Sequence, residues 1–102
     1  SDIVDQVRSY LIKHLSTGNV TEKSVAESLF KSLRTMQRGL KERNTSFSQI
    51  LNDVRKDLAL KYLADNGFSL TEIGFMLGFS ESSSFSRAFR RWTGSSPSKY
   101  RS

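Results

Sequence analysis

Apolar residues recur at every third or fourth position along most of this 102-residue chain, which is the spacing of an amphipathic helix. The strict alternation of apolar and polar residues that is typical of β-strands is scarce, and the chain contains one proline. The pattern therefore predicts an all-α fold with about seven helices.

The places where the helical spacing stops define these helices. They are expected at roughly 2–15, 22–29, 33–43, 46–65, 70–77 and 81–93, and a last turn begins at Pro97. Side chains that cap helix N-termini precede five of them, namely Thr21, Ser32, Ser46, Ser69 and Ser80, and Ser69 with Glu72 matches the capping box S-x-x-E. Gly18, Asn44, Gly78 and Gly94 are expected to end helices, and Gly18 and Asn44 suit a left-handed backbone.

Two of the predicted helices carry a polar, largely basic face opposite an apolar one. The polar positions, at i, i+3, i+4 and i+7, are Arg34, Gln37, Arg38 and Lys41 in one helix and Ser83, Ser86, Arg87 and Arg90 in the other. The apolar positions behind them are Leu33, Met36 and Leu40, and Phe85, Ala88, Phe89 and Trp92. Each helix follows a shorter apolar segment and a few connecting residues, so two helix-turn-helix units are predicted.

The two units form a degenerate internal repeat. Ala26, Leu29, Phe30, Ser32, Met36, Arg38 and Leu40 correspond to Gly74, Leu77, Gly78, Ser80, Phe85, Arg87 and Phe89. The second copy has one extra residue between Ser80 and Phe85. A single helix-turn-helix pattern arises by chance in many helical proteins, so the prediction depends on the repetition.

The helix expected at 46–65 is the longest and is predicted to join the two units. Its apolar positions keep the helical spacing throughout: Phe47, Ile50, Leu51, Val54, Leu58 and Tyr62. Its length would be on the order of 27–30 Å. Two independent cores would each be marginal in so short a chain, so a shared element is expected. The predicted division is a first subdomain at 1–45, a linker helix at 46–66 and a second subdomain at 67–102.

The two polar faces supply the candidate DNA-binding residues: Arg34, Thr35, Gln37, Arg38 and Lys41 on the first helix, and Ser82, Ser83, Ser86, Arg87 and Arg90 on the second. The major groove of DNA accepts a helix and presents hydrogen-bonding base edges. Arginine can bond guanine, and glutamine can bond adenine, through two hydrogen bonds. Arg34, Gln37 and Arg38 are therefore predicted to read bases, with phosphate as the alternative partner of Arg38. The competing interpretation of the first face is a solvated charged surface, and that of the second face is that Ser80 to Ser83 merely cap the helix.

The second face is predicted to anchor the chain on DNA more than it discriminates sequences. Serine hydroxyls are short donors and acceptors for phosphates or bases, and the exposed N-terminus of a helix attracts phosphate. Three roles remain possible for Arg87, namely contact with a base, contact with a phosphate and stabilisation of the subdomain. The aromatic residues Phe79, Phe85, Phe89 and Trp92 are expected in the core rather than as stacking platforms for single strands.

The composition narrows the classes of function. A formal net charge of +6 favours a polyanionic partner without separating DNA, RNA and acidic membrane. There is no cysteine, and no apolar run is long enough to span a membrane. The single histidine, His14, builds neither a metal site nor a triad. Asp53, Asp57 and Asp65 are expected to balance Arg55, Lys56 and Lys61. No enzyme, catalytic residue, cofactor or metal is predicted.

The segment from Thr71, TEIGFMLGFSESSSFSRAFRRWTGSSPSKYR, closely resembles the second helix-turn-helix of AraC/XylS-type transcription activators. The matching positions are Ile73, Gly78, Phe79, Ser84, Phe85, Arg87, Phe89, Arg90, Gly94, Pro97, Tyr100 and Arg101. The earlier segment SLRTMQRGLKERNTSFSQILNDVR is similar to the first unit of one branch. The resemblance implies seven helices, a linker helix and a preceding effector-binding or dimerisation domain. The start at Ser1 rather than methionine agrees with the expectation of a longer protein.

Three positions depart from the family pattern. Gly74 stands where alanine is usual. Glycine destabilises a helix by about 1 kcal/mol relative to alanine, unless close packing requires it. Phe30 stands where the first turn commonly has glycine, so a different turn geometry is expected. Gly39 lies inside the first polar-faced helix, where many relatives have arginine.

These observations predict sequence-specific binding of double-stranded DNA, with two recognition helices in successive major-groove segments about 34 Å apart. The resemblance implies transcription regulation in bacteria, by activation, in the cytoplasm and associated with the nucleoid, with RNA polymerase as a candidate further partner. The isolated domain is expected to be a monomer without a membrane partner. The rival interpretation is a helical protein-interaction module that docks an acidic partner. RNA binding is disfavoured because the A-form major groove excludes such helices.

Overall fold

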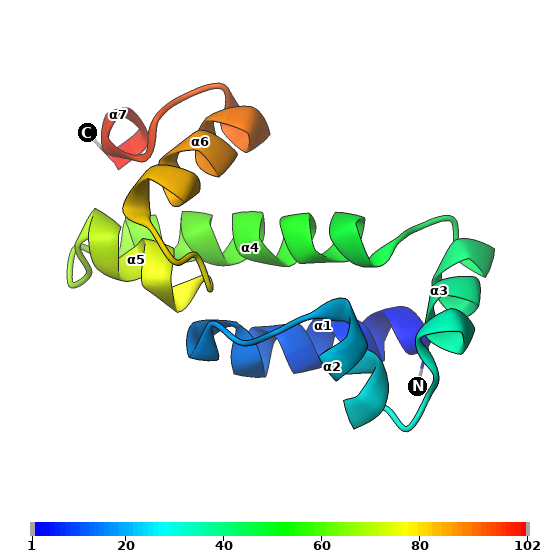
Figure 1. Cartoon of the computed structure of the whole chain (residues 1–102). Coiled ribbons are helices and arrows are strands. Elements are labelled where there is room, and N and C mark those ends of the chain that lie inside the picture. Colours follow the sequence, from blue (N-terminus) through cyan, green and yellow to red (C-terminus); the bar gives the residue numbers. More distant parts are fainter. Residues whose placement is uncertain (1, 102) are drawn as a thin grey trace.

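A computed structural model describes residues 2–101, which fold into seven α-helices without a strand (Figure 1). The helices are α1 (Ile3–His14), α2 (Glu22–Ser28), α3 (Leu33–Glu42), α4 (Phe47–Ala64), α5 (Leu70–Met76), α6 (Ser82–Thr93) and α7 (Pro97–Arg101), and a 3₁₀ turn, η1 (Leu15–Thr17), follows α1. The predicted all-α fold is confirmed.

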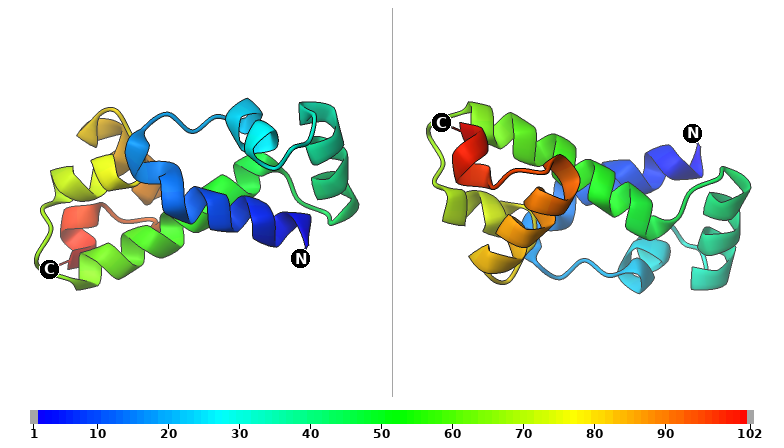
Figure 2. Two further views of the ribbon diagram at one scale, coloured as in Figure 1. Left: turned by 90° about the horizontal axis from the view of Figure 1, so that it is seen from below. Right: turned by 90° about the horizontal axis from the view of Figure 1, so that it is seen from above.

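Helix α4 forms the long axis of the molecule, whose extents are 42 × 25 × 22 Å. Helix α1 packs against α4 and crosses it at an angle, as the views in Figure 2 show. Helices α2 and α3 lie toward one end of α4, and α5, α6 and α7 lie at the other end (Figure 1). The two helix-turn-helix units are therefore separated along the axis.

Local hydrogen bonds explain where most helices begin. The side chains of Thr21, Ser32, Ser46 and Ser69 each accept a hydrogen bond from the backbone N–H three residues further on, which confirms four of the five predicted caps. The Ser69 capping box is complete, because the Glu72 carboxylate also accepts from the Ser69 N–H at 2.9 Å. These bonds from the Ser69 backbone and side chain hold the pKa of Glu72 below its usual range.

The prediction of Ser80 as the cap of α6 is wrong. The residue at the N-cap position of α6 is Glu81, whose side chain makes no capping hydrogen bond, and α6 begins at Ser82. The physical reason is the extra residue in the second copy of the repeat. It places the capping position of α6, Glu81, three residues after Gly78, whereas the capping position of α3, Ser32, lies two residues after Phe30.

Positive φ angles mark the ends of helices and turns as expected. Asn44 has a φ of 60°, and Gly18, Gly78 and Gly94 have φ angles of 76°, 89° and 83°. Helix α1 ends one residue earlier than predicted, and η1 carries the chain from there to Gly18.

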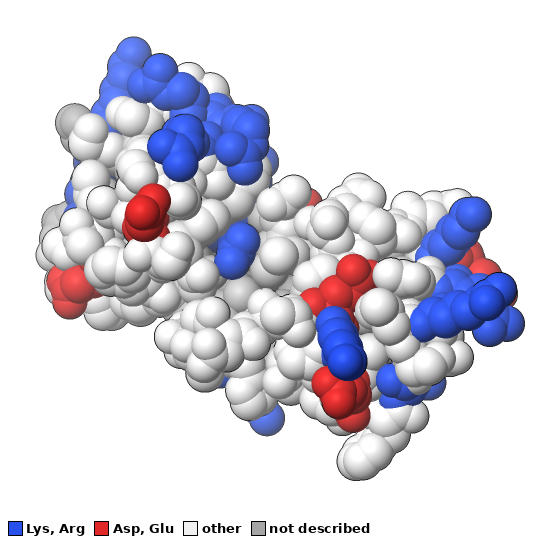
Figure 3. Space-filling model, viewed as in Figure 1, with Lys and Arg blue, Asp and Glu red and all other residues white. Residues whose placement is uncertain are grey.

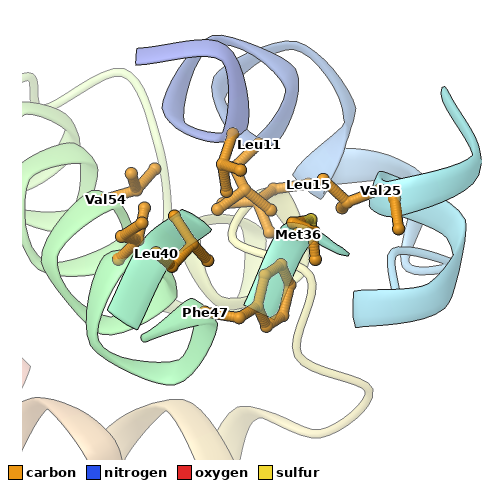
Figure 4. Packing of buried hydrophobic residues seen from close by; sticks show 10 residues of the cluster. Leu11, Leu15, Val25, Met36, Leu40, Phe47 and Val54 are labelled. Atoms are coloured by element: carbon orange, nitrogen blue, oxygen red, sulfur yellow. The ribbon is translucent and has the colours of Figure 1, made fainter. Parts of the chain in front are cut away.

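Helix α4 contributes to both hydrophobic clusters. The first cluster, seen closely in Figure 4, consists of Val7, Leu11, Leu15, Val25, Ala26, Met36, Leu40, Phe47, Ile50 and Val54. The second consists of Ala59, Leu63, Ile73, Leu77, Phe85 and Phe89. Leu58, between the two groups of α4 residues, is half-buried and packs against both. A single long helix thus supports two small cores.

A half-buried arginine, Arg55, joins the second unit to the linker. The Nε atom of Arg55 in α4 donates a hydrogen bond to the carbonyl oxygen of Leu77 at 2.9 Å, and its guanidinium lies 4.2 Å from the centre of the Phe79 ring. Desolvation by burial lowers the pKa of Arg55. The prediction that neighbouring aspartates balance Arg55 is therefore wrong, because the side chain faces the turn after α5. Among residues 2–101, the one ion pair joins Arg43 and Asp2.

Candidate nucleic-acid interface

Helix α3 separates its apolar and polar residues by position. Met36 and Leu40 are fully buried in the first cluster. The opposite face carries the five predicted residues, and all are exposed: Arg34, Thr35, Gln37, Arg38 and Lys41. The helical repeat places side chains three and four residues apart on one side, so burial of Met36 and Leu40 orients the polar residues outward.

Helix α6 repeats this arrangement at the other end of the molecule. Phe85, Ala88 and Phe89 are buried, while Phe79 and Trp92 are half-buried and pack against the same cluster. These aromatic rings contact one another at centroid distances of 5.9–6.4 Å, which agrees with their expected core position. The predicted residues of the polar face, Ser82, Ser83, Ser86, Arg87 and Arg90, are all exposed.

The structure brings each set of predicted residues together on one helix and keeps the two sets apart. Helices α3 and α6 lie at opposite ends of the molecule (Figure 1). Lysine and arginine side chains gather over these two ends, and acidic side chains lie beside them at both ends (Figure 3). The surface therefore offers two separate basic regions that can face one extended polyanion.

Two predicted residues on α3 already have protein partners. The Nε2 atom of Gln37 donates a hydrogen bond to Oε2 of Glu22, the first residue of α2, at 3.0 Å. The Thr35 hydroxyl accepts a bond from the Ser32 hydroxyl at 2.8 Å, beside the Thr35 N–H that donates to the same Ser32 oxygen. Thr35 thus belongs to the cap of α3, and the Gln37 side chain is hydrogen-bonded to the neighbouring helix α2.

Sequence reasoning missed two residues of these surfaces. Glu22 was not singled out, and only its position at the start of the helix before α3 could have suggested a contact with Gln37. Arg91 is exposed on α6 one turn after Arg87, and this i, i+4 spacing was a signal for the edge of the basic face.

At Phe30, where α2 ends, the backbone has the same geometry as at Gly78, where α5 ends, contrary to the expectation of a different geometry there. Phe30 has a φ of 59° and so adopts the left-handed conformation of Gly78. Two backbone hydrogen bonds impose the left-handed conformation at each place. The N–H groups of Phe30 and Lys31 donate to the carbonyl oxygens of Glu27 and Ala26. In the second unit the N–H groups of Gly78 and Phe79 donate to the carbonyl oxygens of Phe75 and Gly74. The Phe30 side chain is 96% exposed.

The two helical glycines have different surroundings. A Cβ atom on Gly74 would lie 3.2 Å from the Cβ atom of Phe85, so close packing of α5 on α6 accounts for glycine there. A Cβ atom on Gly39 would lie 3.7 Å from the Ile3 side chain, which is ordinary contact. Gly39 therefore has room for a larger residue.

No group of three or more histidine, cysteine, aspartate or glutamate side chains within residues 2–101 could hold a metal ion. Over the same residues, none of the helices has both the length and the apolar character needed to cross a membrane.

Comparison with known proteins identifies the family. A family model described as a helix-turn-helix domain matches residues 25–102. The ornithine utilization regulator of Pseudomonas aeruginosa is 50% identical over 76 residues, which are 74% of this chain and 22% of that protein. The urease operon transcriptional activator of Escherichia coli is 34% identical over 101 residues, which are 95% of this chain and 34% of that protein.

A solved structure agrees with these relatives. The DNA-binding domain of the global transcriptional factor AdpA, solved in complex with a target DNA, matches with a TM-score of 0.82 at 27% identity and covers 99% of this chain and 91% of that chain. The present chain spans 22% and 34% of the lengths of the two relatives above. The chain thus belongs to the AraC/XylS-type family of helix-turn-helix DNA-binding transcription regulators.

Proposed function

We propose that this chain binds double-stranded DNA sequence-specifically through α3 and α6, which enter two successive major-groove segments on one side of the duplex. The observation that carries the proposal is the pair of exposed basic helix faces at opposite ends of the molecule, joined by one long linker helix. Successive major-groove segments are about 34 Å apart, and the longest extent of the chain is 42 Å. Each unit alone binds weakly, and α4 raises the effective concentration of the second contact.

The proposed role of the chain in the intact protein is transcriptional activation in the bacterial cytoplasm, associated with the nucleoid. The urease operon relative is an activator by name, which supports activation over repression. The much greater length of the relatives supports an additional effector-binding or dimerisation domain. RNA polymerase is the proposed further partner. The isolated chain is proposed to be a monomer. Its proposed division is a first subdomain at 1–45, a linker helix at 46–66 and a second subdomain at 67–102. Sedimentation of a stable dimer at micromolar concentration would contradict the monomeric state.

The proposed roles on α3 can be tested by alanine substitution. Arg34→Ala and Gln37→Ala are expected to weaken binding to a duplex selected from a random pool by about 1–3 kcal/mol each, because each removes hydrogen bonds to a base edge. Preference should relax at one or two base pairs. Equal losses on selected and scrambled duplexes would instead favour a basic surface without base readout, as in a protein-interaction module.

A further inference from the structure

The contact between Glu22 and Gln37 joins the beginning of α2 to the middle of the exposed α3 face. Glu22 follows the Thr21 cap, where Thr21 and Ser24 bond each other's backbone N–H groups at 3.0 and 2.9 Å. This capping box fixes the backbone that carries the Glu22 side chain, which is half-buried. From there Oε2 of Glu22 accepts the bond from Nε2 of Gln37 at 3.0 Å.

An ionised carboxylate accepts hydrogen bonds and donates none, so it distinguishes the two ends of a glutamine amide. With Nε2 toward Glu22, the contact is a charge-assisted hydrogen bond. If the amide flipped, its oxygen would face the carboxylate and the two would repel. Glu22 therefore holds Gln37 in one orientation, and the amide keeps its oxygen and its second N–H for another partner.

We propose that Glu22 is the positioning residue that sets the base preference of Gln37. This inference rests on the proposed function, in which Gln37 reads a base. Adenine presents one acceptor and one donor side by side in the major groove. An amide held in one orientation bonds that pair in a single order along the groove, whereas a freely flipping amide accepts the opposite order as well. The protein therefore supplies the orientation before DNA arrives.

A purely electrostatic or structural role for Glu22 would have different consequences. Loss of a negative charge near a polyanion strengthens binding to every duplex alike. Loss of a helix-stabilising residue lowers the folded fraction, which weakens binding to every duplex alike. Neither effect changes the ratio of the dissociation constants for two duplexes measured with the same variant. The discrimination ratio is thus the readout that only positioning moves.

The test uses the 102-residue chain and a labelled duplex that it selects from a random pool. The base pair read by Gln37 is identified first, as the position at which Gln37→Ala loses preference. Glu22→Gln keeps the size of the side chain and removes the fixed orientation, because an amide can donate or accept. We expect Glu22→Gln to reduce discrimination at that base pair roughly three- to tenfold and to leave it unchanged at the position read by Arg34.

Glu27→Gln is the matched control, because Glu27 is exposed on the same helix, carries the same charge and makes no hydrogen bond to Gln37. It should leave the discrimination ratio unchanged. Glu22→Gln combined with Gln37→Ala should discriminate no less than Gln37→Ala alone. If Gln37→Ala relaxes the preference while Glu22→Gln behaves like Glu27→Gln, the positioning role is wrong and base readout stands. If Gln37→Ala relaxes nothing, both the readout and the positioning role are wrong.

Discussion

At the scale of single residues, Phe30 combines an unfavourable backbone with an unburied ring. Its φ is 59° and its side chain is 96% exposed, so the ring contributes no packing that offsets the conformation. A left-handed conformation destabilises a residue that has a Cβ atom by about 1–2 kcal/mol. Gly78 takes the same conformation in the second unit without that penalty.

Phe30→Gly is therefore expected to raise the free energy of unfolding by about 1 kcal/mol, because glycine adopts the left-handed region freely. Urea denaturation measures the change. Phe30→Ala is the control, since it removes the ring and keeps the Cβ atom, and it should leave stability nearly unchanged. Equal gains from the two substitutions would place the penalty in the ring rather than in the backbone.

Gly39 offers a second test of local conformation. Gly39→Ala should raise the free energy of unfolding by about 0.5–1 kcal/mol, because alanine is the better helix former and its Cβ atom would only touch Ile3. Gly78→Ala should lower it, since φ is +89° there and the added atom would lie 2.8 Å from the Leu15 carbonyl oxygen. Thermal unfolding of both variants decides the point, and a loss of stability in Gly39→Ala would contradict it.

At the scale of the elements, Arg55 holds the turn after α5 against α4. A hydrogen bond from a charged group contributes about 1.5–3 kcal/mol and a cation–π contact about 0.5–1 kcal/mol. The burial that lowers the pKa of Arg55 offsets part of this gain. Arg55→Met, which keeps an apolar stem, is therefore expected to reduce the free energy of unfolding by about 1–2 kcal/mol.

The control for Arg55→Met is Lys56→Met, because Lys56 is the next residue on α4 and its side chain makes no hydrogen bond or ion pair within residues 2–101. Urea denaturation of both variants compares the effects. A loss in Arg55→Met no larger than in Lys56→Met would show that the bond to the Leu77 carbonyl does not secure the second unit.

The elements also show what the sequence can and cannot predict. Capping at Thr21, Ser32, Ser46 and Ser69 depends on residues three positions apart, and periodicity alone identifies the buried and exposed faces of α3 and α6. The start of α6 differs from the predicted one because the second copy of the repeat has an extra residue. The sequence alone does not show where that residue is accommodated, since this depends on how Phe85 packs in the core.

Contacts between distant residues were beyond prediction for a different reason. Arg101 donates to the carbonyl oxygens of Tyr62, Leu63, Asp65 and Phe68, and Gln37 bonds Glu22. A periodic pattern indicates which side chains point outward, but the neighbour that each one meets depends on how the helices pack. The candidate DNA-binding residues remain a prediction, and the structure adds their exposure and the Gln37 contact.

At the scale of the whole molecule, the two basic faces are proposed to have unequal roles. Arg90 offers a charge to the phosphate backbone, and each phosphate contact that is lost reduces the dependence of log affinity on log salt by roughly one unit. Arg90→Ala should therefore weaken binding to selected and scrambled duplexes together and flatten the salt dependence. Ser83→Ala should change the salt dependence less, because a hydroxyl releases no counterion. A changed sequence preference under α6 in either variant would make α6 a reader of bases and contradict this asymmetry.

The central claim is that one chain places α3 and α6 on DNA at the same time. The most direct measurement is the affinity of the chain for duplexes in which the spacing between its two selected half-sites is varied. Half-sites one turn apart lie on the same side of the duplex, and about 5 added base pairs rotate one of them to the opposite side. Because α4 fixes the separation of α3 and α6, we expect this insertion to reduce the affinity to that of a duplex with a single half-site. Unchanged affinity after the insertion would show that one helix-turn-helix unit binds alone, and would contradict the account.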